Sequence, residues 1–312
     1  MTSTFHDCWF LTGATAVGKT SVGIALAERV GAEIISLDSM AIYRGMDIGT
    51  AKPSRELRDR VPHHLIDVVD PTDEFSVSQY VDAAAVVVGE IRGRGREPLF
   101  VGGTPLYLKS LLRGLFDGPP ADWRLREEIE QELEQVGHEA LYDRLTHIDP
   151  VAASNIHPND TRRLIRALEV FRATGEPLSH QQLQFDDERA AEDCRVFVLR
   201  RSREESHRRI EERVQAMVAA GLVDEARGLT ADGRELGRTA RQAVGYREAL
   251  AFLAGEYDHD EMINRITYRT RRFAKRQGTW FRSLSECRFV DIAGEADAEA
   301  IAGSIVDGVT EF

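Results

Sequence analysis

A short glycine-rich loop near the N-terminus constrains the fold of this chain more than any other feature. Gly13-Ala14-Thr15-Ala16-Val17-Gly18-Lys19-Thr20 matches the pattern G-x-x-x-x-G-K-[ST], between an apolar run at 8–12 and a helical pattern that ends at Gly31. In such a loop, backbone N–H groups converge on an anion, the lysine adds charge and the threonine hydroxyl can reach Mg²⁺. We predict that residues 13–20 bind a di- or triphosphate and that Thr20 ligates Mg²⁺. The alternative is a glycine-rich turn with an exposed lysine.

Strand and helix patterns alternate along most of the chain. Short apolar runs predict further strands at residues 33–37, 99–101, 195–199 and 288–292. Helical spacing predicts helices at residues 77–91, 204–220, 243–253 and 261–282. This alternation is typical of a parallel sheet covered on both faces. The predicted fold class is therefore α/β, a P-loop parallel sheet flanked by helices.

The pattern changes after Gly118. From residue 122 to about residue 185 we find only helical patterning, which predicts an inserted all-helical domain. We therefore divide the 312 residues into a first part of the P-loop catalytic core at 1–121, a helical insertion at 122–190, and a second part of the core at 191–312. The second part of the core carries an arginine-rich helix near its C-terminus.

Composition excludes several other classes of protein. The chain is 42% hydrophobic and 29% charged, which is typical of a globular protein. Its longest apolar run, at 83–88, is far shorter than a membrane span, and residues 1–8 lack the pattern of a signal peptide. The three cysteines have no C-x-x-C spacing, so they indicate neither disulfides nor a zinc site. We expect a cytoplasmic protein without a membrane partner.

One carboxylate stands at the end of a predicted strand. The strand at 33–37 leads into Asp38, whereas the strand at 99–101 leads into the small-residue loop 102–104. Ligands of open α/β sheets bind at the carboxyl ends of the strands, which is also where the phosphate loop lies. Asp38 is therefore a candidate functional carboxylate. The alternative is that it caps the next turn or helix.

Motifs along nearly the whole chain agree with a single family. Besides the phosphate loop, they are 38–53 (DSMAIYRGMDIGTAKP), 62–67 (PHHLID), 102–107 (GGTPLY), 162–170 (RRLIRALEV), 245–247 (GYR) and 275–282 (KRQGTWFR). In these segments the chain resembles the tRNA dimethylallyltransferases, also called tRNA isopentenyl-diphosphate transferases. It departs from the family pattern at Ala14, where many members have proline, at Ala41, where many have glutamine, and at Pro105, where glycine is common.

The resemblance implies an activity. The family moves a dimethylallyl group from dimethylallyl diphosphate to the exocyclic amine of the adenosine 3′ of the tRNA anticodon. The loop at 13–20, with Mg²⁺, would then stabilise the departing diphosphate, and Asp38 would accept the amine proton. Thr15 and Thr104 are the other implied catalytic residues. The alternatives are that Thr15 only fills the loop and that Thr104 caps a helix. We expect a monomer that binds tRNA through its anticodon stem-loop.

Arginine clusters offer a surface for RNA although the net charge is −12. Residues 265, 269, 272 and 276 are arginines that share one helix face, with Ile263, Ile266, Phe273 and Trp280 on the face expected to be buried. A second cluster lies in the insertion at 162–166. A charge run is more often only a solvated face, but the two clusters together favour RNA.

The predicted tRNA contacts combine these clusters with positions that the family resemblance adds. They are Asp38, Ser39, Met40, Ala41, Thr104, Arg126, Arg162, Arg163, Arg166, Arg272, Lys275, Arg276 and Gln277.

Two other functions remain open from the sequence. A P-loop small-molecule kinase would share the loop and the sheet, but it would leave the motif at 38–53 and the arginine helix unexplained. A non-catalytic RNA-binding adaptor would use the loop only to sense a nucleotide, and it would leave Asp38 without a task. The donor of the transferred group, a prenyl diphosphate or ATP, distinguishes the enzymes from each other and from the adaptor.

Overall fold

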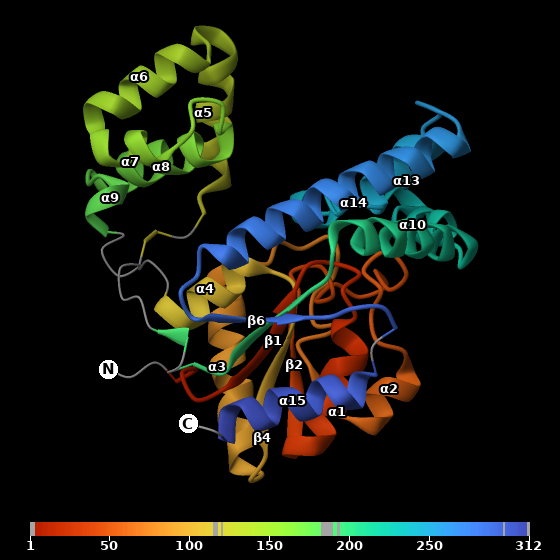
Figure 1. Cartoon of the computed structure of the whole chain (residues 1–312). Coiled ribbons are helices and arrows are strands. Elements are labelled where there is room, and N and C mark those ends of the chain that lie inside the picture. The colour runs from red at the N-terminus through yellow and green to blue at the C-terminus, as the bar shows by residue number, and fades with distance from the viewer. Residues whose placement is uncertain are drawn as a thin grey trace. The chain divides into compact units, whose positions relative to one another are not determined.

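The chain forms two compact units in this computed structural model, which describes residues 4–114, 118–119, 121–181, 190–191, 194–295 and 297–310. The first unit, here called the core, comprises Met1–Leu112 and Glu188–Phe312, and the second, here called the insertion, comprises Arg113–Asp187 (Figure 1). The insertion predicted from the sequence spans 122–190. Residues 182–189 of that range lie outside the described residues.

A six-stranded parallel sheet organises the core. Its strands, in spatial order, are β3 (His63–His64), β2 (Ala32–Leu37), β4 (Glu97–Gly102), β1 (Trp9–Gly13), β5 (Val196–Arg200) and β6 (Cys287–Asp291). In the register, Leu37 lies opposite Gly102 and Gly13 lies opposite Leu199. The strands run in one direction, so the loop after β1, Asp38 after β2 and Gly103 after β4 meet at the same edge of the sheet. The predicted α/β fold class is confirmed.

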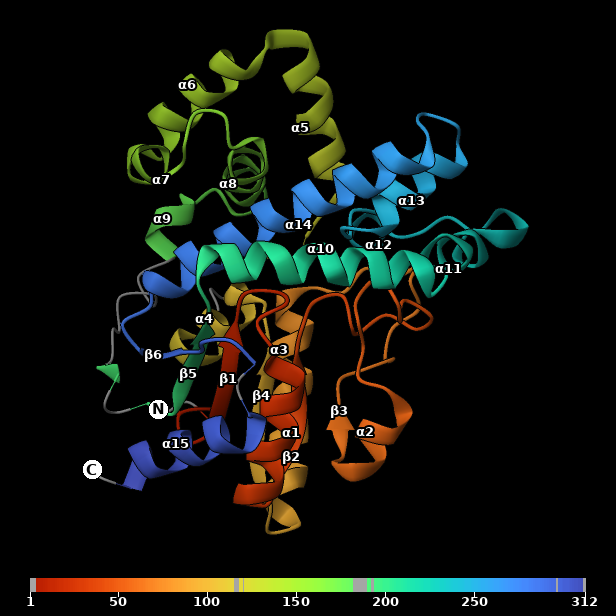
Figure 2. The same cartoon turned by 45° about the vertical axis from the view of Figure 1, so that its right-hand side comes forward.

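Helices cover both faces of the sheet. Those of the core are α1 (Lys19–Val30), α2 (Arg55–Arg60), α3 (Val77–Gly93), α4 (Pro105–Arg113), α10 (Arg203–Ala219), α11 (Leu222–Leu229), α12 (Arg238–Arg241), α13 (Tyr246–Leu253), α14 (His259–Arg282) and α15 (Ala298–Thr310). Buried side chains of α1 and α15 form one apolar cluster on the sheet, and those of α3 and α4 belong to another. Figure 2 shows α10 and α14 passing across the end of the sheet at which β1 stops.

Helices are the only regular elements among the described residues of the insertion. Its helices are α5 (Trp123–Val136), α6 (His138–Ile148), α7 (Pro150–Asn155), α8 (Thr161–Thr174) and α9 (Leu178–Gln181). Three of them begin where the sequence offers a capping aspartate: Asp122, Asp149 and Asp160 each accept a bond from a backbone N–H in the first turn. The apolar stripes of these helices meet in a separate cluster that includes Ile129, Leu141 and Leu164. The insertion therefore has a hydrophobic core of its own.

Among the described residues, no helix combines the length and the apolar composition needed to cross a membrane. Several elements of the core were not predicted from the sequence, among them α2, α11, α12, β3 and α15. β3 is a two-residue edge strand made of histidines, and α15 begins in the acidic stretch after residue 291.

Candidate active site at the phosphate loop

The loop between β1 and α1 needs glycine at both ends. Gly13 has φ +142°, and a Cβ there would lie 2.5 Å from the carbonyl oxygen of Leu199 on the neighbouring strand. Gly18, the N-cap of α1, has φ +105°. Side chains other than hydrogen are strained at both positions, so the two glycines of the motif let the backbone turn tightly into the helix. Thr20 follows as an exposed residue in the first turn of α1.

Lys19 lies inside this loop, and its pKa is lower than that of an ordinary lysine. Its Nζ donates to the carbonyl oxygens of Gly13, at 3.0 Å, and of Ala14, at 2.8 Å. The pKa of Lys19 is lowered to about 8, mainly by burial and also by the nearby Arg213, while Asp38 acts in the opposite direction. Burial also lowers the pKa of Arg213, again opposed by Asp38. Two desolvated cations and one carboxylate therefore interact at this edge of the sheet, which favours an incoming anion.

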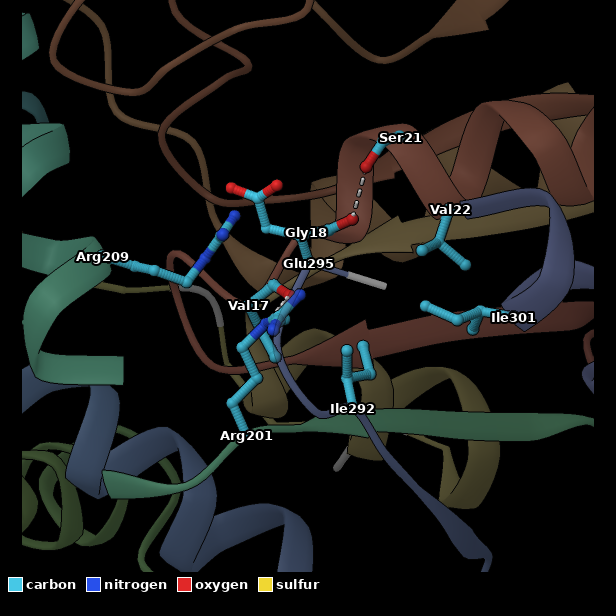
Figure 3. A pocket seen from close by; sticks show the side chains of 9 residues that line it. All are labelled: Val17, Gly18, Ser21, Val22, Arg201, Arg209, Ile292, Glu295 and Ile301. Atoms are coloured by element: carbon cyan, nitrogen blue, oxygen red, sulfur yellow. Dashed lines mark hydrogen bonds between the residues drawn. The ribbon is translucent and has the colours of Figure 1, made fainter. Parts of the chain in front are cut away.

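Two more arginines fix the outer side of the loop. Arg209, from α10, donates through Nε to the carbonyl oxygen of Ala16 at 2.8 Å, and Arg201 donates through Nε to that of Val17 at 3.0 Å. Both side chains line a cavity of 210 Å³ together with Gly18. Figure 3 shows the side chains that line it. These arginines and Arg213 were not predicted from the sequence. They are almost 200 residues from the loop along the chain, and no local motif connects them to it.

Asp38 and Thr104 lie at the ends of neighbouring strands. Asp38 accepts backbone N–H bonds from Met40, at 2.9 Å, and from Ala41, at 3.4 Å, both through Oδ1. The Oγ1 of Thr104 accepts the N–H of Ser39 at 3.0 Å. The turn-capping alternative considered for Asp38 is thus present through one of its two oxygens. The contact from Thr104 joins the turn after β2 to the loop after β4, so the two predicted catalytic side chains belong to one structure.

Gln277 connects helix α14 to two of these loops. Its Oε1 accepts the N–H of Thr15 at 2.9 Å, and its Nε2 donates to the carbonyl oxygen of Gly103 at 2.5 Å. The side chain is buried, at 3% exposure. A Cβ on Gly103 would lie 2.7 Å from Nε2, so glycine allows this close approach. The structure gives Gln277 a role in holding the phosphate loop, and its contact with tRNA stays a prediction.

A partly buried clamp, formed by Glu225 and Tyr246, holds the segment that follows Asp38. The carboxylate of Glu225 accepts the N–H groups of Asp47, Ile48 and Gly49 at 2.9–3.3 Å. The hydroxyl of Tyr246 donates to Glu225 and accepts the N–H of Gly49. The next carbonyl oxygen, of Thr50, accepts a long bond of 3.5 Å from Arg213. This clamp therefore extends to the cation that interacts with Asp38.

The predicted RNA contacts of the insertion divide into two groups. Arg126 and Arg166 both pair with Glu169, which is fully buried, at 3.0 and 2.7 Å. Arg166 also donates to the carbonyl oxygen of Pro119. Arg162 and Arg163 are exposed on α8. The first pair therefore joins the entry of the insertion to α8, whereas the second pair faces solvent.

Helix α14 presents a more continuous cationic face. Arg265, Arg272, Lys275 and Arg276 are exposed. Arg269, predicted on this face, instead pairs with the buried Glu248 at 2.7 Å. The prediction that Phe273 faces the core is wrong, because its side chain is 37% exposed. The buried residues of α14 lie towards its two ends, at 262 and 266 and at 277 and 281, so Phe273 falls in the section between them.

Known proteins resemble this chain over nearly its whole length. The family model described as IPP transferase matches residues 41–284, and the one described as isopentenyl transferase matches residues 6–65. The tRNA dimethylallyltransferase of Rhodopirellula baltica is 50% identical, with 99% of this chain and 96% of that protein aligned. The tRNA dimethylallyltransferase of Geobacter metallireducens is 46% identical, with 92% and 93% aligned.

Solved structures agree with the sequence comparison. The full-length tRNA isopentenylpyrophosphate transferase of Bacillus halodurans aligns with a TM-score of 0.70 at 39% identity, covering 98% of this chain and 97% of that one. A eukaryotic dimethylallyltransferase described as acting on tRNA aligns with a TM-score of 0.76 at 26% identity, covering 97% and 78%. The fold and site thus define a P-loop α/β transferase. The chain belongs to the tRNA dimethylallyltransferase family, as the resemblance of its motifs predicted.

Proposed function

We propose that this chain transfers the dimethylallyl group of dimethylallyl diphosphate to the exocyclic amine of the adenosine 3′ of the tRNA anticodon. The observation that supports it best is the meeting of Lys19, Arg213 and Asp38 at one edge of the sheet. This site can neutralise a diphosphate while a carboxylate faces the nucleophile. Membership of the family supplies the class of reaction.

Stabilisation of the leaving group is the task we assign to the phosphate loop. As the allylic carbon–oxygen bond breaks, its electron pair moves to the diphosphate, where negative charge grows. The N–H groups of residues 13–20 and the ammonium of Lys19 would stabilise that charge in a preorganised site. Lys19 now donates to two loop carbonyl oxygens, and an arriving diphosphate would offer stronger, charged acceptors.

Asp38 is the group that we assign to the nucleophile. The adenine amine is weakly nucleophilic because its lone pair is delocalised into the ring, so removal of an amine proton helps as the nitrogen–carbon bond forms. Oδ1 of Asp38 is held by the turn that it caps, and this fixes the direction of the carboxylate. Thr15 and Thr104 would then act as positioning residues. The N–H of Thr15 and the hydroxyl of Thr104 are already engaged in holding the site together.

The residues at the loop fit a magnesium ion bound mainly through the substrate. Mg²⁺ prefers oxygen ligands and is commonly held by one or two protein groups plus phosphate oxygens. The exposed Thr20 in the first turn of α1 can supply such a group. In the part of the chain that the structure describes, no cluster of three or more His, Cys, Asp or Glu side chains could hold a metal. The ion would add positive charge next to the departing diphosphate.

Transfer of label tests this proposal. The protein is incubated with unmodified tRNA, magnesium and radiolabelled dimethylallyl diphosphate, and in parallel with γ-labelled ATP. We expect label in tRNA from the prenyl donor only. The variant Asp38→Ala should keep its affinity for tRNA and lose most of its turnover, whereas an equal loss of affinity and rate would make Asp38 a scaffold residue. Transfer from ATP would contradict the proposal, and so would a lack of transfer from both donors.

A further inference from the structure

The most exposed aromatic side chains of the protein each lie next to an arginine. Among the described residues, the three most exposed Trp, Tyr and Phe side chains are Trp123, Tyr268 and Phe273. Each has an arginine guanidinium over its ring, from Arg126, Arg272 and Arg276 respectively, at 4.7–5.9 Å from the ring centroid. Buried rings such as those of Trp9 and Phe197 also have an arginine over them, so exposure is what distinguishes these three. An exposed ring on a cationic surface is the combination that proteins use to stack nucleobases.

Tyr268 is the most exposed of the three and lies in the cationic face of α14. Its side chain is 61% exposed. Helical spacing places it between Arg265 and Arg272 on this face, three residues after the first and four before the second. From residue 262 to the end of the helix at 282, α14 carries no acidic residue. The acidic residues of α14, Asp260 and Glu261, lie in its first turn, where Glu261 pairs with Arg265 at 2.7 Å. A polyanion that approaches the ring of Tyr268 from the side of Arg272 therefore meets no like charge on this section of the helix.

The opposite face of the same helix reaches the active site. Gln277 is buried and contacts the phosphate loop, whereas Tyr268 is exposed nine residues earlier. Nine residues of helix span roughly 14 Å. This separation is too large for Tyr268 to touch the adenine that reacts at the loop. An RNA strand that enters the site and continues along α14 would bring a different nucleotide to Tyr268.

We propose that Tyr268, backed by Arg272, stacks on an unpaired base of the anticodon loop other than the target adenosine. This inference rests on the proposed function, because it assumes that tRNA is the substrate. The charges suit RNA: Arg272, Lys275 and Arg276 can contact phosphates while the ring provides an apolar surface for a base. Stacking of this kind would hold the strand at a second point, next to the extruded nucleotide.

Binding of an unmodified anticodon stem-loop transcript to three variants tests the proposal. Tyr268→Ala should raise Kd about 5- to 150-fold, which corresponds to about 1–3 kcal/mol for one base–aromatic stack. Tyr268→Phe should stay within about twofold of the native protein, because it keeps the ring. The salt dependence of Kd should be unchanged in both, since neither variant removes a charge. Val86→Ala, at an exposed position on α3, is the control for a general loss of surface apolar area.

A scan with single abasic nucleotides identifies the partner base. At one loop position other than the target adenosine, removing the base should abolish the effect of Tyr268→Ala. The proposal would be overturned if Tyr268→Ala left Kd unchanged, or if Tyr268→Phe lost as much affinity as Tyr268→Ala. It would also be overturned if the effects of Tyr268→Ala and of base removal on the binding free energy were additive at every loop position. Failure of the proposed function would be seen separately, as absence of prenyl transfer by the native protein. A partner of another kind, such as an acidic protein surface, would leave RNA binding unaffected by all three variants.

Discussion

Helix α14 and the insertion carry similar runs of arginine but use them differently. In the insertion, Arg126 and Arg166 converge on the buried Glu169, so their charges are already satisfied within the unit. On α14, Arg272 and Arg276 also lie over aromatic rings, as Arg126 does over Trp123, but their side chains are exposed. The first arrangement stabilises a fold, whereas the second leaves guanidinium groups accessible to a phosphate. An arginine motif therefore indicates an RNA contact only after its carboxylate partners are known.

Glu169→Ala tests the structural half of this comparison and should have the largest effect. The substitution leaves two partly buried guanidinium groups without their carboxylate, which typically costs about 3–5 kcal/mol. Hydrogen exchange of the α5 and α8 amides should show a loss of that size in the free energy of opening. Glu132→Ala is the matched control: Glu132 also pairs with two arginines, Arg144 and Arg172, but is more exposed, and we expect a loss of about 1 kcal/mol or less. Equal losses would contradict the distinction between the buried and exposed networks.

Lys19→Ala tests the phosphate loop, where a cation is buried against carbonyl oxygens. Removing a group that stabilises developing charge costs about 2.7–4 kcal/mol, so kcat/KM should fall about 100- to 1,000-fold. Lys275→Ala, on the exposed face of α14, should instead act mainly on KM for tRNA. Steady-state kinetics with each substrate varied in turn checks both expectations. If both variants lost kcat/KM to a similar extent and in the same kinetic parameter, the proposed difference in function between Lys19 and Lys275 would be wrong.

The low pKa of Lys19 predicts a pH dependence of diphosphate binding. The pKa of about 8 lies below the ordinary value of 10.5, so Lys19 loses its proton as pH rises through about 8. Affinity for inorganic pyrophosphate should therefore fall above that pH, by up to about tenfold per pH unit. Calorimetry on the native protein and on Lys19→Ala separates this effect from titration of the ligand. If both proteins show the same pH profile, Lys19 does not control it.

Arg272→Ala should have the smallest effect and affect RNA binding alone. Loss of one phosphate contact should reduce the slope of log K against log salt concentration by about one, with stability nearly unchanged. Arg166→Ala is the comparison variant, because its guanidinium is bonded to Glu169 and Pro119. We expect that variant to lose stability rather than salt dependence. An unchanged slope in Arg272→Ala would remove this residue from the interface.

Local sequence patterns were sufficient to predict most strands of the sheet and the position of the phosphate loop. Apolar runs predicted five of the six strands, and the loop motif predicted the position of the phosphate site. β3 was missed because two histidines at a sheet edge have no apolar pattern. Asp38 could be placed at the edge because it directly follows a strand.

The site residues that sequence patterns did not identify are brought to the site by long-range contacts. The arginine-rich helix α10 has the composition of a solvated surface helix. Its Arg209 nevertheless bonds to the phosphate loop, and its Arg213 lies close enough to Lys19 to lower the pKa of that lysine. Gln277 lies among exposed basic residues in the sequence, but the rotation of α14 buries it. Sequence spacing shows which residues share a face of a helix. Which of those faces is buried depends on the elements that pack against the helix.

The bridge made by Gln277 limits what evolution can place at that position. Its two contacts demand opposite chemistry, an acceptor for the N–H of Thr15 and a donor for the carbonyl oxygen of Gly103. Ionised glutamate would bring its second oxygen against that carbonyl, lysine would leave the amide without an acceptor, and asparagine is one methylene too short. In a saturation library selected for activity, this codon should retain a single amino acid, while its exposed neighbours at 275 and 276 drift among basic residues.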